Sequence, residues 1–124
     1  MDDQNRDGLI KQVTLQLITA YGYVIKALQG LPLPIEIPPL LGDQYRAEVS
    51  ESLIRVAEVL LTGIPMDPDH RQDVRALVID WLAANDYLFA LQEDYATWKL
   101  DFVVTQLTRV KARWQIIQEH RSQE

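Results

Sequence analysis

Two acidic residues, Glu48 and Glu51, are the first candidates for chemistry in this sequence. They lie three residues apart, so a helix through this segment places both carboxylates on one face, one turn from each other. Paired carboxylates can hold Mg²⁺, the ion that accompanies nucleotide phosphates. Chelation of a triphosphate requires a second acidic pair, and Asp80 and Asp86 lack that spacing. We interpret Glu48 and Glu51 as a solvated helix face and keep metal-dependent nucleotide hydrolysis as an alternative.

A second candidate pair combines a guanidinium and an imidazole. Arg113 and His120 are seven residues apart, two helical turns, and therefore also share a helix face. An imidazole can transfer protons and a guanidinium carries a permanent positive charge, two properties that can serve catalysis. The pair lies near the end of the last expected helix, and the residue directly after Arg113 is apolar. We interpret this end as an exposed helix terminus and keep ribonuclease activity as an alternative.

Both patterns resemble motifs of known helical enzymes. The Glu48-Val-Ser-Glu51 pair is similar to the magnesium-binding pairs of the all-helical nucleotide pyrophosphohydrolases, which this chain also resembles in size and helix content. The Arg113 and His120 pair has the Arg-x6-His form of the HEPN-type ribonucleases, small helical domains in which a dimer brings two such pairs together. Each resemblance rests on two residues and implies an enzyme as the alternative function.

One further segment gathers residue types that bind divalent metals. His70 lies close in sequence to the carboxylates of Asp67, Asp69 and Asp73. The spacing does not match an EF-hand, and the sequence contains neither the Glu-x-x-His motif of di-iron bundles nor any cysteine. We therefore expect no metal and no cofactor, and we interpret Asp67 as a helix cap followed by Pro68 in the first helical position.

Length and charge narrow the class of protein. The 124 residues fit one helical domain, residues 1–124. The net charge of −6 repels phosphate backbones and anionic lipid, which disfavours nucleic acid and membrane surfaces as partners. No window approaches the roughly 18 uninterrupted apolar residues of a membrane span, and the acidic N-terminal residues lack the pattern of a secretory signal. We expect a cytoplasmic protein.

Two helices are expected before residue 64. The first starts among Asp3, Asn5 and Asp7 and runs to about Gln29, and Gly30 is expected to cap it in the left-handed conformation. Residues 31–42 contain four prolines and therefore form an extended connector. This connector either crosses the whole bundle, which leaves the first two helices parallel, or folds over one end as a lid, or serves as a docking strip. Asp43 is expected to cap the second helix, which ends at Gly63.

The rest of the chain contains neither Gly nor Pro after residue 68. A single helix from Pro68 to Glu119 would be about 78 Å long at 1.5 Å per residue, which does not suit a small domain. We therefore expect a break at residues 92–94, with residues 85–86 as the alternative. The predicted fold is all-α, a four-helix bundle with a long Pro-rich connection between helices 1 and 2.

Apolar side chains suggest what the bundle contacts. Two apolar stripes run through residues 77–117, and between residues 88 and 102 they cover at least two sides of a helix, more than one bundle core buries. The sequence therefore predicts a second contact surface and a homodimer. Its candidate interface residues are all aromatic: Tyr87, Phe89, Tyr95, Trp98, Phe102 and Trp114.

The favoured function is a non-enzymatic protein-interaction module that binds another protein. An adaptor, an assembly chaperone and a helical subunit of a larger complex are the forms that we expect. The reason is that aromatic residues dominate the energetics of protein interfaces, whereas neither candidate pair forms a complete catalytic set.

Overall fold

The computed structural model describes residues 3–40 and 46–122, and this part of the chain contains helices and no strands. Four α-helices are present, together with a short 3-10 helix, η2, that follows the second of them. The α-helices are α1 (Asp3–Gln29), α2 (Arg46–Glu58), α3 (Pro68–Glu93) and α4 (Thr97–Ser122), and η2 spans Leu60–Gly63. The predicted all-α fold with four helices is confirmed. Among the described helices, none is long and apolar enough to cross a membrane.

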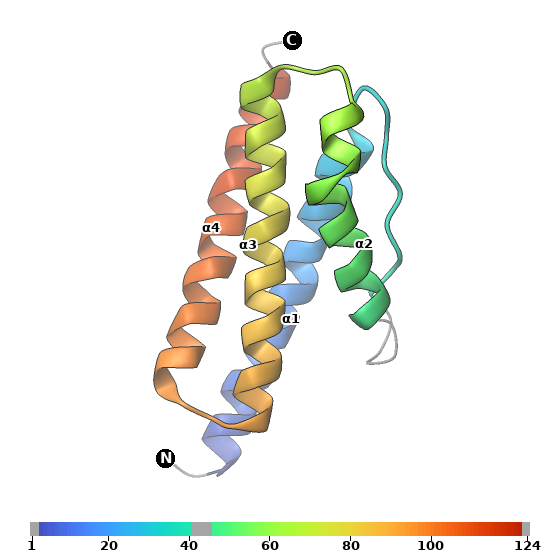
Figure 1. Ribbon diagram of the computed structural model, residues 1–124. Coiled ribbons are helices and arrows are strands. Elements are labelled where there is room, and N and C mark those ends of the chain that lie inside the picture. Colours follow the sequence, from blue (N-terminus) through green and yellow to red (C-terminus); the bar gives the residue numbers. More distant parts are fainter. Residues whose placement is uncertain (1–2, 41–45, 123–124) are drawn as a thin grey trace.

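The direction of the helices follows from the connector between α1 and α2. Residues 31–40 run back along the side of the bundle from the end of α1, and α2 then starts partway along α1 and points in the same direction (Figure 1). As a result α1, α2 and α4 point the same way and only α3 runs in the opposite direction (Figure 1). The parallel first two helices expected of a crossover are thus observed, and residues 31–40 lie along the side of the bundle rather than over its end (Figure 1).

The connector is held by both polar and apolar contacts. The Ile35 N–H donates to the Leu28 carbonyl at 3.1 Å, and the Tyr21 hydroxyl donates to the Pro38 carbonyl. Leu31 is buried, and Ile37 is partly buried against the core. These contacts compensate for the missing proline N–H groups and fix an otherwise irregular segment on the bundle.

The end of α1 differs from the expected left-handed glycine cap. Gly30 does not adopt the left-handed conformation, and a Cβ atom at this position would overlap the guanidinium of Arg121. That guanidinium, from the last turn of α4, donates to the carbonyls of Ala27 at 2.7 Å and Lys26 at 3.3 Å. The Lys26 carbonyl also accepts from the Gly30 N–H at 3.1 Å, whereas the Ala27 carbonyl is satisfied by Arg121, a side chain remote in sequence.

The second helix is shorter than predicted. Asp43, its expected cap, lies outside the described residues. The α-helix ends at Glu58, and a 3-10 turn continues to Gly63, so that Leu60 is only partly buried. Arg71 from α3 donates to two carbonyls just beyond this end, those of Leu61 at 3.0 Å and Ile64 at 2.6 Å.

Both ends of α3 agree with the sequence analysis. The Asp67 carboxylate accepts from the Asp69 N–H at 2.8 Å, and Pro68 occupies the first helical position. The helix ends at Glu93 and Asp94 is extended, which confirms the predicted break. The alternative break at residues 85–86 lies inside α3, where the side chain of Asn85 is buried and donates to Ser50 Oγ at 3.4 Å.

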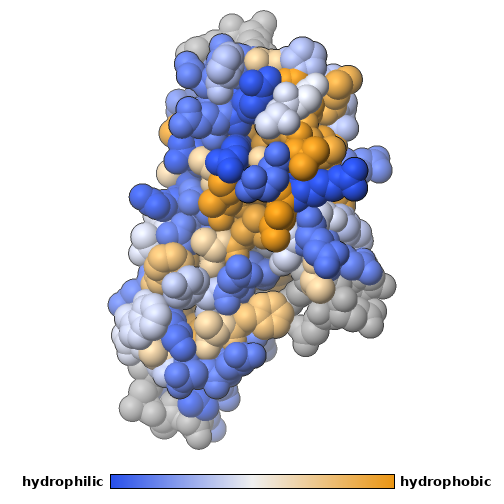
Figure 2. Space-filling model, viewed as in Figure 1, coloured by the Kyte–Doolittle hydropathy of each residue, from blue (hydrophilic) through white to orange (hydrophobic). Residues whose placement is uncertain are grey.

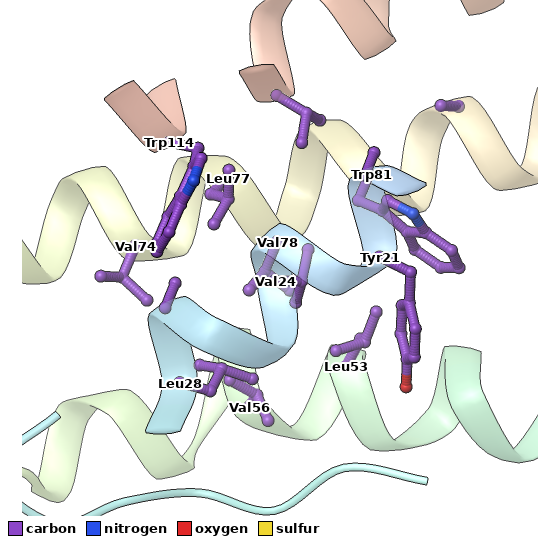
Figure 3. Packing of buried hydrophobic residues seen from close by; sticks show 14 of the residues in the cluster. Tyr21, Val24, Leu28, Leu53, Val56, Val74, Leu77, Val78, Trp81 and Trp114 are labelled. Carbon is purple, nitrogen blue, oxygen red and sulfur yellow. The ribbon is translucent and has the colours of Figure 1, made fainter. Parts of the chain in front are cut away.

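The core lies where the four helices face one another, and Trp81 is its largest fully buried side chain (Figure 3). Its indole Nε1 donates to the Leu17 carbonyl at 3.0 Å, and its ring lies 5.0 Å from that of Tyr21. Both predicted stripes are buried over most of their length. The buried members are Leu77, Trp81, Ala84, Leu88 and Leu91 in α3, and Val103, Leu107, Val110, Trp114 and Ile117 in α4.

Candidate protein-binding surface

Three of the predicted interface residues come together at the hairpin between α3 and α4. We call Tyr87, Trp98 and Phe102 the aromatic cluster. The Tyr87 ring lies 4.1 Å from that of Phe102 and 6.1 Å from that of Trp98, which it meets edge-on at 74°. Tyr87 and Phe102 are half-buried, whereas Trp98 is 60% exposed. The antiparallel hairpin thus presents a large apolar side chain on a base of other rings.

Trp98 is further held by its neighbour in sequence. Lys99 Nζ lies 5.7 Å from the centre of the Trp98 ring, within the range of a cation–π contact. The same ammonium donates to the Asp94 carbonyl at 2.9 Å, which attaches it to the end of α3. Trp98 is therefore exposed to solvent and also restrained.

The other three predicted interface residues lie elsewhere. Phe89 is two residues from Tyr87 on α3, and such a step of about 200° points its side chain to the opposite flank of the helix. Tyr95 lies in the hairpin turn, with Arg6 of α1 5.8 Å from its ring centre. Trp114 is 7% exposed, belongs to the core, and stacks on Tyr23 at 6.0 Å. The six residues therefore do not form one surface.

A different apolar patch covers the border between α2 and α3. Figure 2 shows apolar side chains gathered over the upper part of α3 and toward α2. Large exposed apolar residues of this region are Ile54 of α2, Val59 directly after α2, and Ile79 of α3. Arg75 crosses this border, donating to the Ala57 carbonyl at 3.2 Å and approaching Glu58 at 3.7 Å. Charged groups thus interrupt the patch.

The candidate metal pair is exposed on α2. Glu48 and Glu51 both point to solvent. Within residues 3–40 and 46–122, no group of three or more Asp, Glu and His side chains is placed to hold a metal ion. The structure thus adds no further ligand to Glu48 and Glu51.

The second candidate pair lies along the seam between α3 and α4. Arg113 Nη1 is 3.3 Å from the Asp73 carboxylate, and the His120 ring stacks on that of His70 with centres 4.9 Å apart. Arg113 and His120 therefore both face α3, as their spacing predicts, but each contacts a different residue there. Both contacts join the two helices of the hairpin.

Asp80 lies on the same seam, between the two helices. Burial raises the pKa of its carboxyl group, and the nearby Arg109 and Arg113 lower it by a smaller amount. The pKa of Asp80 is therefore raised overall, so the folded protein favours the protonated carboxyl group more than the unfolded chain does.

A groove between α1 and α4 was missed by the sequence analysis. It has a volume of about 500 Å³, and its lining residues include Leu15, Gln16, Ala20, Tyr23, Val104 and Lys111. The two walls are more than eighty residues apart in sequence, so helical periodicity alone could not pair them. One signal was available: neither residues 8–29 nor residues 102–118 contain an acidic residue.

Comparison with known proteins yields no match: no family model fits the chain, and neither a curated protein nor a solved structure is similar to it.

Proposed function

We propose that this chain is a protein-interaction module and that it binds another protein through the aromatic cluster. The observation that carries this proposal is the 60% exposure of Trp98 on a base formed by Tyr87 and Phe102. Tryptophan and tyrosine are the side chains that most often dominate binding energy at protein interfaces. A ring that is already restrained loses little conformational entropy when a partner covers it.

The homodimer expected from the sequence belongs to the same proposal, since two copies can bury their Trp98 rings against each other. The cytoplasm is the proposed compartment, because a chain with no cysteine suits a reducing environment. Glu48 and Glu51 gain no further ligand, and Arg113 and His120 each contact a different residue of α3, so hydrolysis of nucleotides or RNA is not proposed.

The test compares three forms of the whole chain as bait in extracts of the source cells. Trp98→Ala removes the exposed ring, and Ile116→Ala is the matched control, because Ile116 is also exposed on α4 but lies outside the cluster. We expect a partner that the wild type and Ile116→Ala capture equally and that Trp98→Ala loses by about tenfold or more, as a hot-spot residue implies. Mass spectrometry with quantitation measures the ratio.

A partner set that Trp98→Ala leaves unchanged contradicts the proposal. Light scattering on the same three proteins examines the homodimer. A dimer that uses the cluster has twice the 14.3 kDa mass of one chain, and Trp98→Ala returns it to the mass of a monomer. A single-chain mass for the wild type at high micromolar concentration rules out the dimer but leaves binding of another protein open to the first test.

A further inference from the structure

The groove between α1 and α4 has a recessed apolar floor and more exposed walls. Ala20 and Leu107 form part of the floor and are 3% and 7% exposed. Leu15 and Val104 stand at the walls and are 59% and 41% exposed. The small side chain of Ala20 leaves space that a larger residue would fill. A partner with a complementary shape that entered this groove would cover the exposed side chains of Leu15 and Val104 and remove them from water.

The dimensions of the groove suit a helix. Its α1 wall extends from Gln12 to Tyr23, about 16 Å at 1.5 Å per residue, or three turns. On both walls the lining residues recur at steps of three and four, as on Gln12, Gln16, Thr19 and Tyr23 of α1 and on Val104, Leu107, Thr108 and Lys111 of α4. Such rows form the ridges and grooves into which the side chains of another helix pack.

The lining of this groove carries one charge, the positive charge of Lys111, and no acidic residue, whereas the molecule as a whole is acidic. All eighteen acidic residues lie outside residues 8–29 and 102–118, although the chain has a net charge of −6. Lys11, Lys26 and Lys111 are exposed on these two stretches, and Lys111 lines the groove. The two arginines nearest the seam with α3 are engaged on the other side of α4, where Arg113 pairs with Asp73 and Arg109 lies near Asp80.

We propose that this groove binds an amphipathic α-helix of another protein, with an apolar stripe bordered by Asp and Glu residues. The apolar stripe would cover Ala20, Leu15 and Val104, and its acidic borders would face Lys11 and Lys111. This site is separate from the aromatic cluster. Val104 follows Phe102 by two residues, so their side chains leave α4 on opposite sides.

A helix fits better than the other occupants that combine apolar and acidic character. A lipid surface is flat at this scale, whereas the most apolar atoms here are recessed between two helices. A second copy of this chain offers no helix whose charges are all acidic. Its α2 exposes Arg55 beside Glu48, Glu51 and Glu58, and its α3 carries two arginines among five acidic residues. An amphipathic helix with Asp and Glu residues beside its apolar stripe matches both the shape of the groove and the positive charge of Lys111 in its lining.

The test uses two synthetic peptides that form helices of about five turns at 3.6 residues per turn. Both have leucines at the repeating positions i, i+3 or i+4, and i+7, and both carry a fluorescent label. One has Glu on both borders of this stripe, and the other has Lys at the same positions. Fluorescence anisotropy measures binding of each peptide to the whole chain.

We expect the Glu peptide to bind with micromolar affinity, more weakly as salt rises, and the Lys peptide to bind at least tenfold more weakly. Lys11→Glu combined with Lys111→Glu reverses this preference. Arg55→Glu combined with Arg75→Glu changes the net charge equally and lies outside both the groove and the aromatic cluster, so it leaves the preference unchanged. If a charge-reversed protein fails to fold by circular dichroism, Leu15→Ser with Val104→Ser tests the same walls and weakens the Glu peptide at least tenfold.

Four results overturn the inference. The first is equal binding of the two peptides, and the second is no binding of either peptide. The third is binding of the wild type to anionic vesicles that Lys11→Glu with Lys111→Glu removes, which identifies a lipid surface. The fourth is a doubling of mass in light scattering that the same substitutions abolish, which identifies a second copy. None of these results bears on the Trp98 test, because Trp98 is unchanged in every variant.

Discussion

Tyr21 is a single residue that joins three parts of the molecule. It belongs to α1, its ring contacts Trp81 of α3, and its hydroxyl donates to the Pro38 carbonyl of the connector. Burial raises the pKa of the Tyr21 hydroxyl to about 12, because the phenolate would lose its hydration. The neutral hydroxyl is therefore part of the folded structure.

Tyr21→Phe leaves the Pro38 carbonyl without this donor and should lower the free energy of unfolding by about 0.5–1.5 kcal/mol. Thermal or urea unfolding at pH 7 measures the change. Tyr23→Phe on the same helix is the control and should alter stability by less than half as much. Equal stability of Tyr21→Phe and the wild type contradicts the assigned role of this hydroxyl.

The raised pKa of Tyr21 also predicts the response to alkali. A pKa of about 12 in the folded protein, against 10.0 for an ordinary tyrosine, means that the stabilisation is complete below pH 10 and is lost between pH 10 and 12. In a series of unfolding curves over this range, Tyr21→Phe should lose stability less steeply than the wild type. Parallel curves for the two proteins would show that Tyr21 titrates normally.

Asp80 predicts a change of stability in the acid range, whereas Tyr21 predicts one in alkali. Its pKa is raised mainly by burial, so the ionised carboxylate lowers the stability of the fold at neutral pH and this loss disappears as the pH falls through the raised value. Asp80→Asn should therefore raise the melting temperature at pH 7 and leave it unchanged near pH 3. Asp86→Asn, at an exposed position of the same helix, is the control. A lower melting temperature for Asp80→Asn at pH 7 would show that the attraction of Arg109 and Arg113 dominates.

At the scale of the element, the boundaries of α3 could be predicted because they depend on local chemistry. A carboxylate at Asp67 accepts from a free N–H of the first turn, and Pro68 has no N–H to lose. The other end, at Glu93, has no breaker residue and was inferred from helix length alone. Two helices that pack against each other along an antiparallel hairpin need similar lengths, and this requirement placed the end of α3 near Glu93 without a breaker residue.

Asp67→Ala tests the cap directly. It removes the acceptor for the Asp69 N–H and should lower the free energy of unfolding by about 1 kcal/mol. Asp67→Ser keeps a capping oxygen and should retain most of the stability, whereas Asp69→Ala controls for the loss of one charge. Chemical unfolding monitored by tryptophan fluorescence gives the values. Equal losses for Asp67→Ala and Asp69→Ala would indicate an effect of charge rather than of the cap.

Two element ends could not be predicted because their partners are distant in sequence. The carbonyls at the end of α1 are satisfied by Arg121, and those after α2 by Arg71. Each guanidinium replaces a local signal, so glycine rules that hold for isolated helices gave the wrong conformation at Gly30. The aromatic cluster was foreseen only in part for the same reason. Tyr87, Trp98 and Phe102 meet across the hairpin, whereas the burial of Trp114 depends on α1.

At the scale of the whole molecule, the four helices are not held equally. α3 packs along α1, α2 and α4, whereas α2 has only 13 residues and packs its backbone closely against α3 alone among the described α-helices. Residues 30–45 separate α2 from α1 in the chain, and residues 59–67 separate it from α3. The sequence position of α2 therefore sets it apart from the other three helices. We expect α2 to open locally while the other three helices stay folded.

Native-state hydrogen exchange should show this difference. Amides in the middle of α2 are expected to exchange at least about tenfold faster than those in the middle of α1, α3 and α4. Val56→Ala, which removes a fully buried side chain of α2, should accelerate exchange in α2 more than in α4. Uniform protection in all four helices would show instead that the bundle opens only as one unit.

The crossing connector has an electrical consequence for the molecule. In a bundle whose helices alternate in direction their dipoles cancel, but here the carbonyl ends of α1, α2 and α4 lie at one end and only α3 opposes them (Figure 1). Lys26, Arg55 and Arg121 lie in the last turns of these three helices and place positive side chains at that end. The backbone therefore contributes a permanent dipole along the long axis of the bundle. This dipole orients an approaching charged partner toward one end of the bundle before the two molecules touch.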